Sequence, residues 1–319
     1  MFKELKFVQG AVAKKDFIPA MTHFQIKDGR VTAFNGTLAL SSPISCDLDC
    51  KPKAGPMVQA IARCEDTIQL SLTAAGRLSV RSGKFKAFIE CTEDDSPHAE
   101  PSGDEVSFDG ALLLRAFQEL QPFVGNDASR PFTNGILIRN GSAYATNNVC
   151  LAQFYMGFAL PSVVNLPRSA VAEILRINQA PVRMRVESNS VTFEYEDGRW
   201  LRTQLFSTEW PDVDSILNRD HGATPLSEEL FKALEAVKPF CDKNGRVILE
   251  GCTVRTHDSL EEGSSYTLHE NAAWPLSSYR VEMLSLLEGV EFFDAQSFPA
   301  PGLFFKGDRM RGAIIGLRL

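Results

Sequence analysis

The feature that most constrains the fold of this chain is a strand–turn–strand pattern that recurs about every 110 residues. Apolar strands turn at a glycine in three segments, Leu78–Phe85, Val191–Trp200 and Leu303–Met310. The turn glycines Gly83, Gly198 and Gly307 lie 115 and 109 residues apart. A fixed period in a chain of 319 residues indicates three similar parts rather than one large core.

A second match between distant segments supports this period. Ile26–Asn35 aligns without gaps on Ile138–Asn147, and each segment turns at Asp-Gly or Asn-Gly. These dipeptides favour a tight β-hairpin turn. Two segments rich in proline and small polar residues, Ser96–Gly103 and Asn218–Pro225, read as linkers. We therefore predict domains at 1–100, 105–217 and 222–319.

Each predicted part also carries two short amphipathic helical patterns. Asp109 and Ser227 stand at N-cap positions, and Pro56 and Pro167 stand where helices begin. The predicted helices span 2–15, 55–66, 109–124, 166–177, 226–241 and 278–288. Alternating strands such as Val182–Val186 lie between them, so each part is predicted to be an α+β unit.

The charge of the chain is negative but unevenly distributed. A net charge of −7 and a pI near 5.4 argue against a protein that coats nucleic acid. The six predicted helices hold eleven basic and eleven acidic residues, so the rest of the chain carries all of the net charge. No apolar run approaches the ~20 residues of a membrane helix. No secretory signal is visible at the N-terminus, so we expect a cytoplasmic protein.

The sequence offers no positive sign of catalytic chemistry. Glycine-rich nucleotide motifs and a nucleophile elbow are absent, and Ala273 stands where a zincin begun by His269-Glu270 would need histidine. The seven cysteines include no Cys-x-x-Cys, which is typical of a reduced protein; half of a metal site at Cys46 and Cys50 is the weaker alternative. We expect no enzyme, no catalytic residue, no metal and no cofactor.

Several segments resemble the bacterial-type DNA sliding clamps, the DNA polymerase III beta subunit family. Arg130–Ile136 follows the family's Arg-aromatic-x-x-Asn-Gly segment, and Ala145–Ala152 follows its Ala-Thr-Asp-Gly-His-Arg-Leu-Ala segment. Leu166–Arg176 resembles the family's Val-Pro-Arg helix. Phe206–Asp212 resembles its Phe-Pro-Asp stretch, and Ile315–Leu319 resembles its C-terminus. The chain is shorter than typical bacterial members, which favours a phage or mobile-element version.

The resemblance implies three tandem clamp domains, each with two lumen-facing helices and outer antiparallel sheets. It further implies a head-to-tail homodimer ring around double-stranded DNA. Such a processivity factor would hold DNA without reading its sequence, and would tether DNA polymerase and clamp loader through short peptide motifs. Phe85, Phe88 and Phe240 are candidates for the ring interface, with core packing as the alternative for each.

The resemblance also implies two sets of site residues. Those expected near DNA, with a solvated surface charge as the alternative, are Lys14, Lys15, Arg63, Arg130, Arg168 and Arg176. Those expected to wall a peptide pocket between the second and third domains are Thr133, Thr146, Asn148, Leu151, Pro211, Ile216, Ile315, Leu317, Arg318 and Leu319. Core packing is the alternative for Leu151 and Ile315.

The expected pocket departs from the family pattern in its central loop. Asn147-Asn148 replaces Asp-Gly, and Val149-Cys150 replaces His-Arg. Gly316 replaces a proline. Because an arginine and its fork of donors are lost, we expect a different motif preference.

Two other functions remain open at this point. One is a phage clamp mimic that binds the peptide motif and blocks host replication without encircling DNA. The other is a metal-dependent phage enzyme that uses the acidic cluster Glu93-Asp94-Asp95, for which a solvated linker is the competing interpretation.

Overall fold

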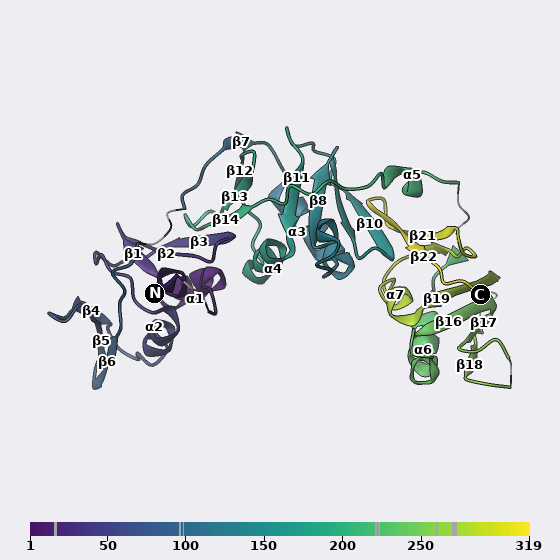
Figure 1. Cartoon of the computed structure of the whole chain (residues 1–319), viewed down its shortest axis with the longest axis horizontal. Coiled ribbons are helices and arrows are strands. Elements are labelled where there is room, and N and C mark those ends of the chain that lie inside the picture. Colours follow the sequence, from purple (N-terminus) through teal and green to yellow (C-terminus); the bar gives the residue numbers. More distant parts are fainter. Residues whose placement is uncertain are drawn as a thin grey trace. The chain divides into compact units, whose positions relative to one another are not determined.

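The computed structural model describes residues 1–15, 18–95, 97, 99–220, 222, 224–259, 261–269 and 273–319. Ser96, His98, His221 and Ala223 of the predicted linkers, and Glu270, lie outside these residues. The chain forms two compact units, one of residues 1–114 and 160–207, the other of residues 115–159 and 208–319 (Figure 1). The chain therefore passes between the units three times. The division into three domains stays a prediction.

The first unit contains a seven-stranded sheet in the order β1-β2-β3-β14-β13-β12-β7. Every neighbouring pair in it is antiparallel. Its strands are β1 (Gln25–Lys27), β2 (Arg30–Phe34), β3 (Leu38–Pro43), β7 (Asp104–Val106), β12 (Arg183–Val186), β13 (Ser190–Glu194) and β14 (Trp200–Gln204). A three-stranded sheet joins β4 (Gln69–Leu72), β5 (Leu78–Ser82) and β6 (Phe85–Ile89). The unit also includes the strand β11 (Val164–Pro167).

Short helices cover these sheets. Helix α1 packs on β2 and β3, while α2 packs against α1 and β6. The helices of this unit are α1 (Phe2–Val8), α2 (Ala54–Ile61) and α4 (Arg168–Ile177), with 3₁₀ turns η1 (Gln9–Ala11) and η2 (Pro19–Thr22). Helix α3 (Gly110–Leu120) spans the boundary between the two units in the sequence. The core of the unit includes Phe7, whose ring meets Tyr195 edge-on at 6.2 Å.

The second unit holds strands in the order β8-β9-β10-β22-β21-β20-β15 and a four-stranded sheet in the order β18-β17-β16-β19. The first set comprises β8 (Gly135–Arg139), β9 (Ser142–Thr146), β10 (Cys150–Tyr155), β15 (Thr224–Pro225), β20 (Phe292–Asp294), β21 (Pro301–Lys306) and β22 (Met310–Ile315). The second comprises β16 (Arg246–Gly251), β17 (Thr253–Arg255), β18 (Ser265–Thr267) and β19 (Trp274–Arg280).

Helices of the second unit pack on both sets of strands. Helix α6 packs on β17 and β18, α7 on β19, and α5 on β22 (Figure 1). These helices are α5 (Asp214–Leu217), α6 (Glu228–Val237) and α7 (Val281–Ser285), with 3₁₀ turns η3 (Gln121–Phe123), η4 (Pro131–Thr133) and η5 (Lys238–Phe240). Buried aromatic rings link the layers, since Phe123 stacks on Phe304 with ring centroids 5.6 Å apart. No helix in the described part of the chain is long and apolar enough to span a membrane.

The predicted hairpins are confirmed. Asp28 and Gly29 both have positive φ between β1 and β2, and Asn140 and Gly141 do the same between β8 and β9. Glycine and asparagine adopt this left-handed backbone at little cost, which is why these dipeptides specify the two tight turns. The three glycine turns of the longer repeat also join antiparallel pairs, β5 to β6, β13 to β14 and β21 to β22.

All six predicted helices are present, but each is shorter than predicted. The first ends at Val8 because the backbone tightens into η1 and becomes extended at Val12. Helices α3 and α6 give way to 3₁₀ turns that contain a proline, which has no backbone N–H to donate to an α-helical hydrogen bond. The last begins at Val281 because β19 continues to Arg280.

Both predicted N-cap residues precede their helices, but only one of the two side chains forms a capping hydrogen bond. Asp109 Oδ1 accepts a hydrogen bond from the Leu112 N–H at 2.9 Å, as an N-cap side chain does. Ser227 also stands at an N-cap position, but its side chain makes no capping hydrogen bond.

Candidate functional site

The second unit contains an apolar cavity of about 420 Å³. Its walls are formed by η4, the β9–β10 loop, α5 with the residues on either side of it, and β21 and β22 with the segment before β21. The lining residues are Phe132, Thr146, Asn148, Val149, Cys150, Leu151, Pro211, Val213, Ile216, Arg219, Pro299, Pro301, Ala313 and Ile315. Antiparallel pairing of β10 with β22 places Leu151 opposite Ala313, so residues far apart in the sequence meet here.

A hydrophobic cluster forms the floor of this cavity. It comprises Leu137, Tyr144, Leu151, Val213, Leu217, Leu303 and Ala313, with Trp210, Ile216 and Phe305 packed against it. Leu151 is 6% exposed, whereas Ile216 and Ile315 are half-buried. Leu151 therefore packs in the core and also lines the cavity. Ile216 and Ile315 have part of their side-chain surface exposed, where a ligand can contact it.

A polar network holds α5 against the strands. Asp214 accepts hydrogen bonds from Arg139 at 3.1 Å and from the Tyr144 hydroxyl at 3.2 Å. Gln153 Nε2 donates to the same hydroxyl at 3.0 Å, and Gln153 Oε1 accepts from Arg311 Nε at 2.6 Å. Burial raises the pKa of Tyr144, and the negative charge of Asp214 raises it further, so this hydroxyl stays a donor. The network fixes the segment that carries Ile216.

The β9–β10 loop is held by its own side chains. Asn147 Oδ1 accepts hydrogen bonds from the N–H groups of Val149 and Cys150 at 3.0 and 2.7 Å. The Thr146 hydroxyl donates to the Cys150 carbonyl at 2.7 Å and accepts from the Asn148 N–H at 3.0 Å. Asn148 has a φ of +72°, a left-handed conformation that asparagine tolerates. The loop is thus a preformed edge of the cavity.

The sulfur of Cys150 is enclosed rather than reactive. Cys150 is 1% exposed, and its Sγ lies 3.6 Å from Met283 Sδ. Burial raises its pKa to about 12, so the thiol is neutral at physiological pH. All seven cysteines are free. Where the family pattern has an arginine, this chain therefore presents an uncharged, buried group.

The cavity brings together part of the predicted peptide-binding set. Thr146, Asn148, Leu151, Pro211, Ile216 and Ile315 line it. Thr133, Leu317, Arg318 and Leu319 do not. Thr133 is buried and its hydroxyl donates to the Arg130 carbonyl at 2.9 Å, while Leu319 is 51% exposed. The peptide-binding role of all ten residues stays a prediction.

Several lining residues were not predicted. Phe132 precedes the predicted Thr133, and Val213 directly follows Pro211-Asp212. Both residues therefore lie within or next to segments that the resemblance had already marked. Pro299 and Pro301 enter because β21 begins beside β22, a pairing the sequence pattern does not reveal. Nothing in the sequence pattern marked Arg219.

The residues predicted to contact DNA differ in their surroundings. Lys14, Lys15, Arg63, Arg130 and Arg168 are exposed, Arg168 as the first residue of α4. Arg176, in contrast, is engaged in contacts within the first unit. Its guanidinium pairs with Glu173 at 2.6 Å and donates to the carbonyls of Phe7 and Lys6 at 2.8 and 3.4 Å. Contact of these six residues with DNA stays a prediction.

The residues predicted for the ring interface lie on the surface or near it. Phe88 on β6 is 52% exposed and Phe240 in η5 is 60% exposed, so neither is a core residue. Phe85 is half-buried. The ammonium group of Lys86 lies 4.5 Å from the centre of the Phe88 ring, a cation–π contact. Their place in an interface stays a prediction.

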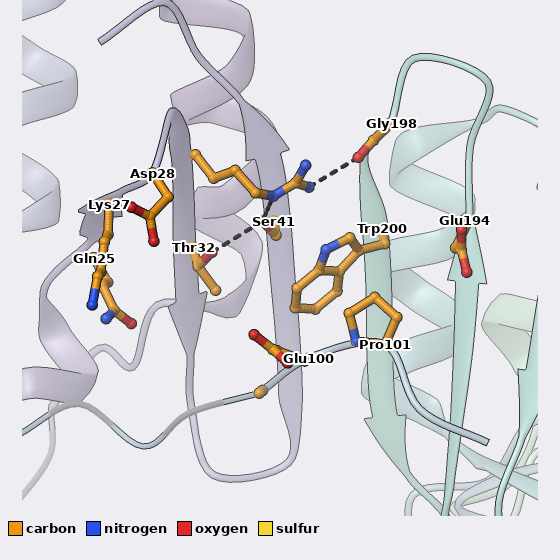
Figure 2. Close-up of a pocket in the computed structure, with 12 residues that line it drawn as sticks. Gln25, Lys27, Asp28, Thr32, Ser41, Glu100, Pro101, Glu194, Gly198 and Trp200 are labelled. Carbon is orange, nitrogen blue, oxygen red and sulfur yellow. Dashed lines mark hydrogen bonds between the residues drawn. The ribbon is translucent and has the colours of Figure 1, made fainter. Parts of the chain in front are cut away.

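A second cavity, of about 470 Å³, lies on the large sheet of the first unit. Figure 2 shows Trp200, Glu100 and Pro101 around it. Arg30 spans it, with hydrogen bonds from Nε to Ser41 Oγ at 3.0 Å and from a terminal nitrogen to the Gly198 carbonyl at 2.9 Å. Glu194 at its rim is already paired with Arg183 and Arg185. Because its charges are of both signs and partly paired, the cavity defines no class of ligand.

The acidic cluster Glu93-Asp94-Asp95 lies in the described part of the chain and is mostly exposed. Within that part, no group of three or more His, Cys, Asp and Glu side chains is arranged to hold a metal ion.

The antiparallel α+β architecture of this chain is the fold of the bacterial DNA sliding clamps. The beta subunit of the DNA polymerase of Streptococcus pyogenes matches with a TM-score of 0.86 at 18% identity, over 100% of this chain and 97% of that one. Caulobacter crescentus pol III beta gives the same four values. The Helicobacter pylori beta clamp bound to a DNA ligase peptide matches with a TM-score of 0.80 at 16% identity, over 100% and 97%.

The predicted fold class is confirmed by these matches. No protein-family model and no curated protein sequence matches the chain. At identities of 18% and below in these three matches, the likeness is one of fold.

Proposed function

We propose that this protein is a DNA polymerase processivity factor, a sliding clamp that encircles double-stranded DNA and tethers replication proteins. The observation that carries the proposal is the agreement of its fold with beta clamps along the whole chain. The proposed mechanism is topological, because a closed ring retains DNA without gripping individual phosphates. It requires no catalytic residue, cofactor or bond-making step, and we place the protein in the cytoplasm with the replication machinery.

The proposed ring is a head-to-tail homodimer. Each end of such a subunit presents a different surface, and the ring closes when the rotation between subunits returns to the start. Phe88 and Phe240 support this arrangement, because large exposed aromatic side chains are typical of interface cores. We assign Phe85, Phe88 and Phe240 to this interface.

The proposed DNA contacts are electrostatic and independent of sequence. Lys14, Lys15, Arg63, Arg130 and Arg168 are exposed and can approach phosphates. The predicted helices, which are expected to face DNA, carry no net charge, and the rest of the chain carries −7. The protein therefore has no large excess of positive charge with which to neutralise phosphates. Because each neutralised phosphate strengthens binding at low salt, few contacts favour sliding over tight retention at one position.

The proposed tether is the apolar cavity of the second unit, acting as a peptide pocket. A volume of about 420 Å³ fits a few bulky side chains of an extended peptide. Ile216, Ile315 and the prolines at positions 211, 299 and 301 supply apolar contacts around a buried floor. DNA polymerase and clamp loader are the proposed partners, through short linear motifs with glutamine and bulky apolar residues.

Electron microscopy of the purified protein in negative stain tests the proposal directly. At micromolar concentration we expect closed rings with six similar lobes, and a sedimenting species of twice the mass of the 35.2 kDa chain. Phe88→Glu is expected to give single subunits, whereas Tyr155→Glu, an equally exposed aromatic residue outside the proposed interface, is expected to leave rings intact. Compact wild-type particles without a hole would contradict the clamp function.

Retention on DNA separates a clamp from a protein that only imitates one. The ring is expected to stay on a circular duplex through gel filtration and to leave when the duplex is cut once. A mimic that blocks replication would show no difference between circular and linear DNA.

A further inference from the structure

A groove lies between helices α6 and α7 of the second unit, which contact each other (Figure 1). Its volume is about 580 Å³, larger than that of either cavity described above. The lining residues are Leu226, Ser227, Glu228, Phe231, Lys232, Glu235, Ser285, Glu288, Gly289 and Val290. None of them lines the apolar cavity beside β22, so the groove is a separate surface.

Helix α6 has two different faces. The helix packs on β17 and β18, and its buried residues are Leu230, Ala233, Leu234 and Val237. The groove is lined by a second set at the three- and four-residue spacing of one helical face, namely Glu228, Phe231, Lys232 and Glu235. Because the first face already anchors the helix, the second is available to another molecule.

The floor of the groove is apolar and its backbone is fixed. Val290 is 6% exposed, and Leu226 and Phe231 are half-buried. The Leu226 N–H bonds to the Glu291 carbonyl at 2.9 Å, and the Val290 N–H bonds to the Leu287 carbonyl at 2.8 Å. A preformed floor of this kind can bury an apolar side chain of a ligand without first being ordered.

The rim of the groove is acidic. Glu228, Glu235 and Glu288 are exposed, and among the described residues none of their carboxylates forms a hydrogen bond or an ion pair. Elsewhere in the second unit carboxylates are paired, as Glu119 is with Lys306 at 2.7 Å. Three glutamates and one lysine leave the groove with a net charge of −2.

Lys232 is the single basic residue among the described lining residues. It lies on the groove face of α6, four residues after Glu228 and three before Glu235. Its ammonium group therefore opposes the entry of a cation that the three carboxylates attract. Removing a glutamate and removing this lysine should thus affect a cationic ligand in opposite directions.

We infer that the groove between α6 and α7 binds a cationic segment of a partner protein, in which a bulky apolar side chain is flanked by lysine or arginine. The apolar side chain packs on the floor, and the flanking cations face the acidic rim. The same negative charge disfavours DNA phosphates as the occupant. This partner site goes beyond the proposed clamp function and does not depend on it.

The expected size of the effect follows from the exposure of the rim. Exposed ion pairs are weak, so each charge should change the dissociation constant about twofold to fivefold at low salt. Salt screens such pairs, so the preference for a cationic ligand should shrink as ionic strength rises.

Two matched synthetic peptides test the groove. Each is a dye-labelled alanine peptide with one tryptophan, blocked at both ends, and the tryptophan is flanked by arginines in one peptide and by glutamines in the other. Kd is measured by fluorescence anisotropy. We expect wild-type protein to bind the arginine peptide more tightly. Glu235→Gln and Glu288→Gln should each weaken its binding about twofold to fivefold, whereas Lys232→Gln should tighten it by a similar factor.

Three control variants separate the groove from other sources of affinity. Glu282→Gln and Lys238→Gln each remove one charge from an exposed residue outside the groove. Both should leave the affinity nearly unchanged, unlike a general attraction by the net charge of the protein. Ile315→Ala should also bind the arginine peptide normally, because Ile315 lines the other cavity.

The outcomes decide the inference independently of the proposed function. Equal affinities of wild type for the two peptides, or no binding of either, would overturn it. So would changes in the same direction in Glu235→Gln and Lys232→Gln. Loss of peptide binding in magnesium chloride but not in sodium chloride of equal ionic strength would instead make the groove a divalent-cation site. None of these results bears on ring formation or on retention on circular DNA.

Discussion

Ile315 offers the sharpest single-residue test of the cavity as a ligand site. It is half-buried at the end of β22, so its side chain can be shortened with limited damage to the core. Ile315→Ala is expected to weaken binding of an apolar peptide about tenfold, because a lost apolar anchor costs about 1–2 kcal/mol. Leu276→Ala, at an exposed leucine outside the cavity, is the control. Equal affinity for both variants would remove Ile315 from the site.

Leu151 illustrates why burial decides which residue can serve such a test. It belongs to the buried cluster beneath the cavity, so Leu151→Ala is expected to lower the free energy of unfolding by about 2–4 kcal/mol. A loss of peptide binding in that variant would report damage to the fold as well as to the site. Denaturant unfolding measures the difference between Leu151→Ala and Ile315→Ala.

His269 and Glu229 form an exposed pair with a defined pH window. The hydrogen bond to Glu229 raises the pKa of His269 above 6.5, and the bond from His269 lowers the pKa of Glu229 below 4.5. The stabilisation from His269 is lost as pH rises through its raised pKa. That from Glu229 is lost as pH falls through its lowered pKa. The pair therefore contributes fully between pH 4.5 and 6.5.

A comparison of melting temperatures checks this window. Wild type should exceed His269→Gln by a larger margin near pH 5.5 than near pH 9, since only the protonated imidazole forms an ion pair. The variant keeps the other histidines, so their titration cancels in the difference. A margin independent of pH would mean that the pair contributes nothing measurable.

At the scale of elements, Arg176 joins α4 to the end of α1. Its guanidinium meets the Glu173 carboxylate and the Phe7 carbonyl, and a Cβ at Gly10 would collide with that carboxylate. Arg176→Gln is therefore expected to lower the free energy of unfolding by about 1–2 kcal/mol. Arg63→Gln, at an exposed arginine after α2, should change it little. Urea unfolding of the two variants side by side is the measurement.

The sequence predicted elements better than it predicted contacts. Asp28-Gly29 and Asn140-Gly141 determine their hairpins locally, because the turn conformation depends on these residues alone. The predicted C-terminal ends of helices lie beyond the observed ends where a 3₁₀ turn follows the α-helix, as at Pro122 and Pro239. The resemblance located Thr146, Leu151 and Ile315 at the cavity. Arg219 escaped because its position depends on Arg311, a residue 92 positions away that anchors α5.

At the scale of the whole molecule, Lys14 and Lys15 test the proposed DNA path. Both are exposed, so Lys14→Glu with Lys15→Glu should leave thermal stability nearly unchanged. The double variant is expected to dissociate from circular DNA at lower salt than wild type, because repulsion replaces two possible phosphate contacts. Retention is measured by gel filtration over a salt series. Identical salt profiles would place these lysines away from DNA.

The chain crosses between its two units three times, and this determines which fragments of the protein can fold alone. A cut between residues 159 and 160 would leave neither unit whole in one fragment. The first unit would depend on pairing between β3 and β14, and the second on pairing between β10 and β22, each across the cut. Two separately produced halves, 1–159 and 160–319, are therefore expected to find each other by fragment complementation, whereas cuts at the predicted linkers would not release independent pieces.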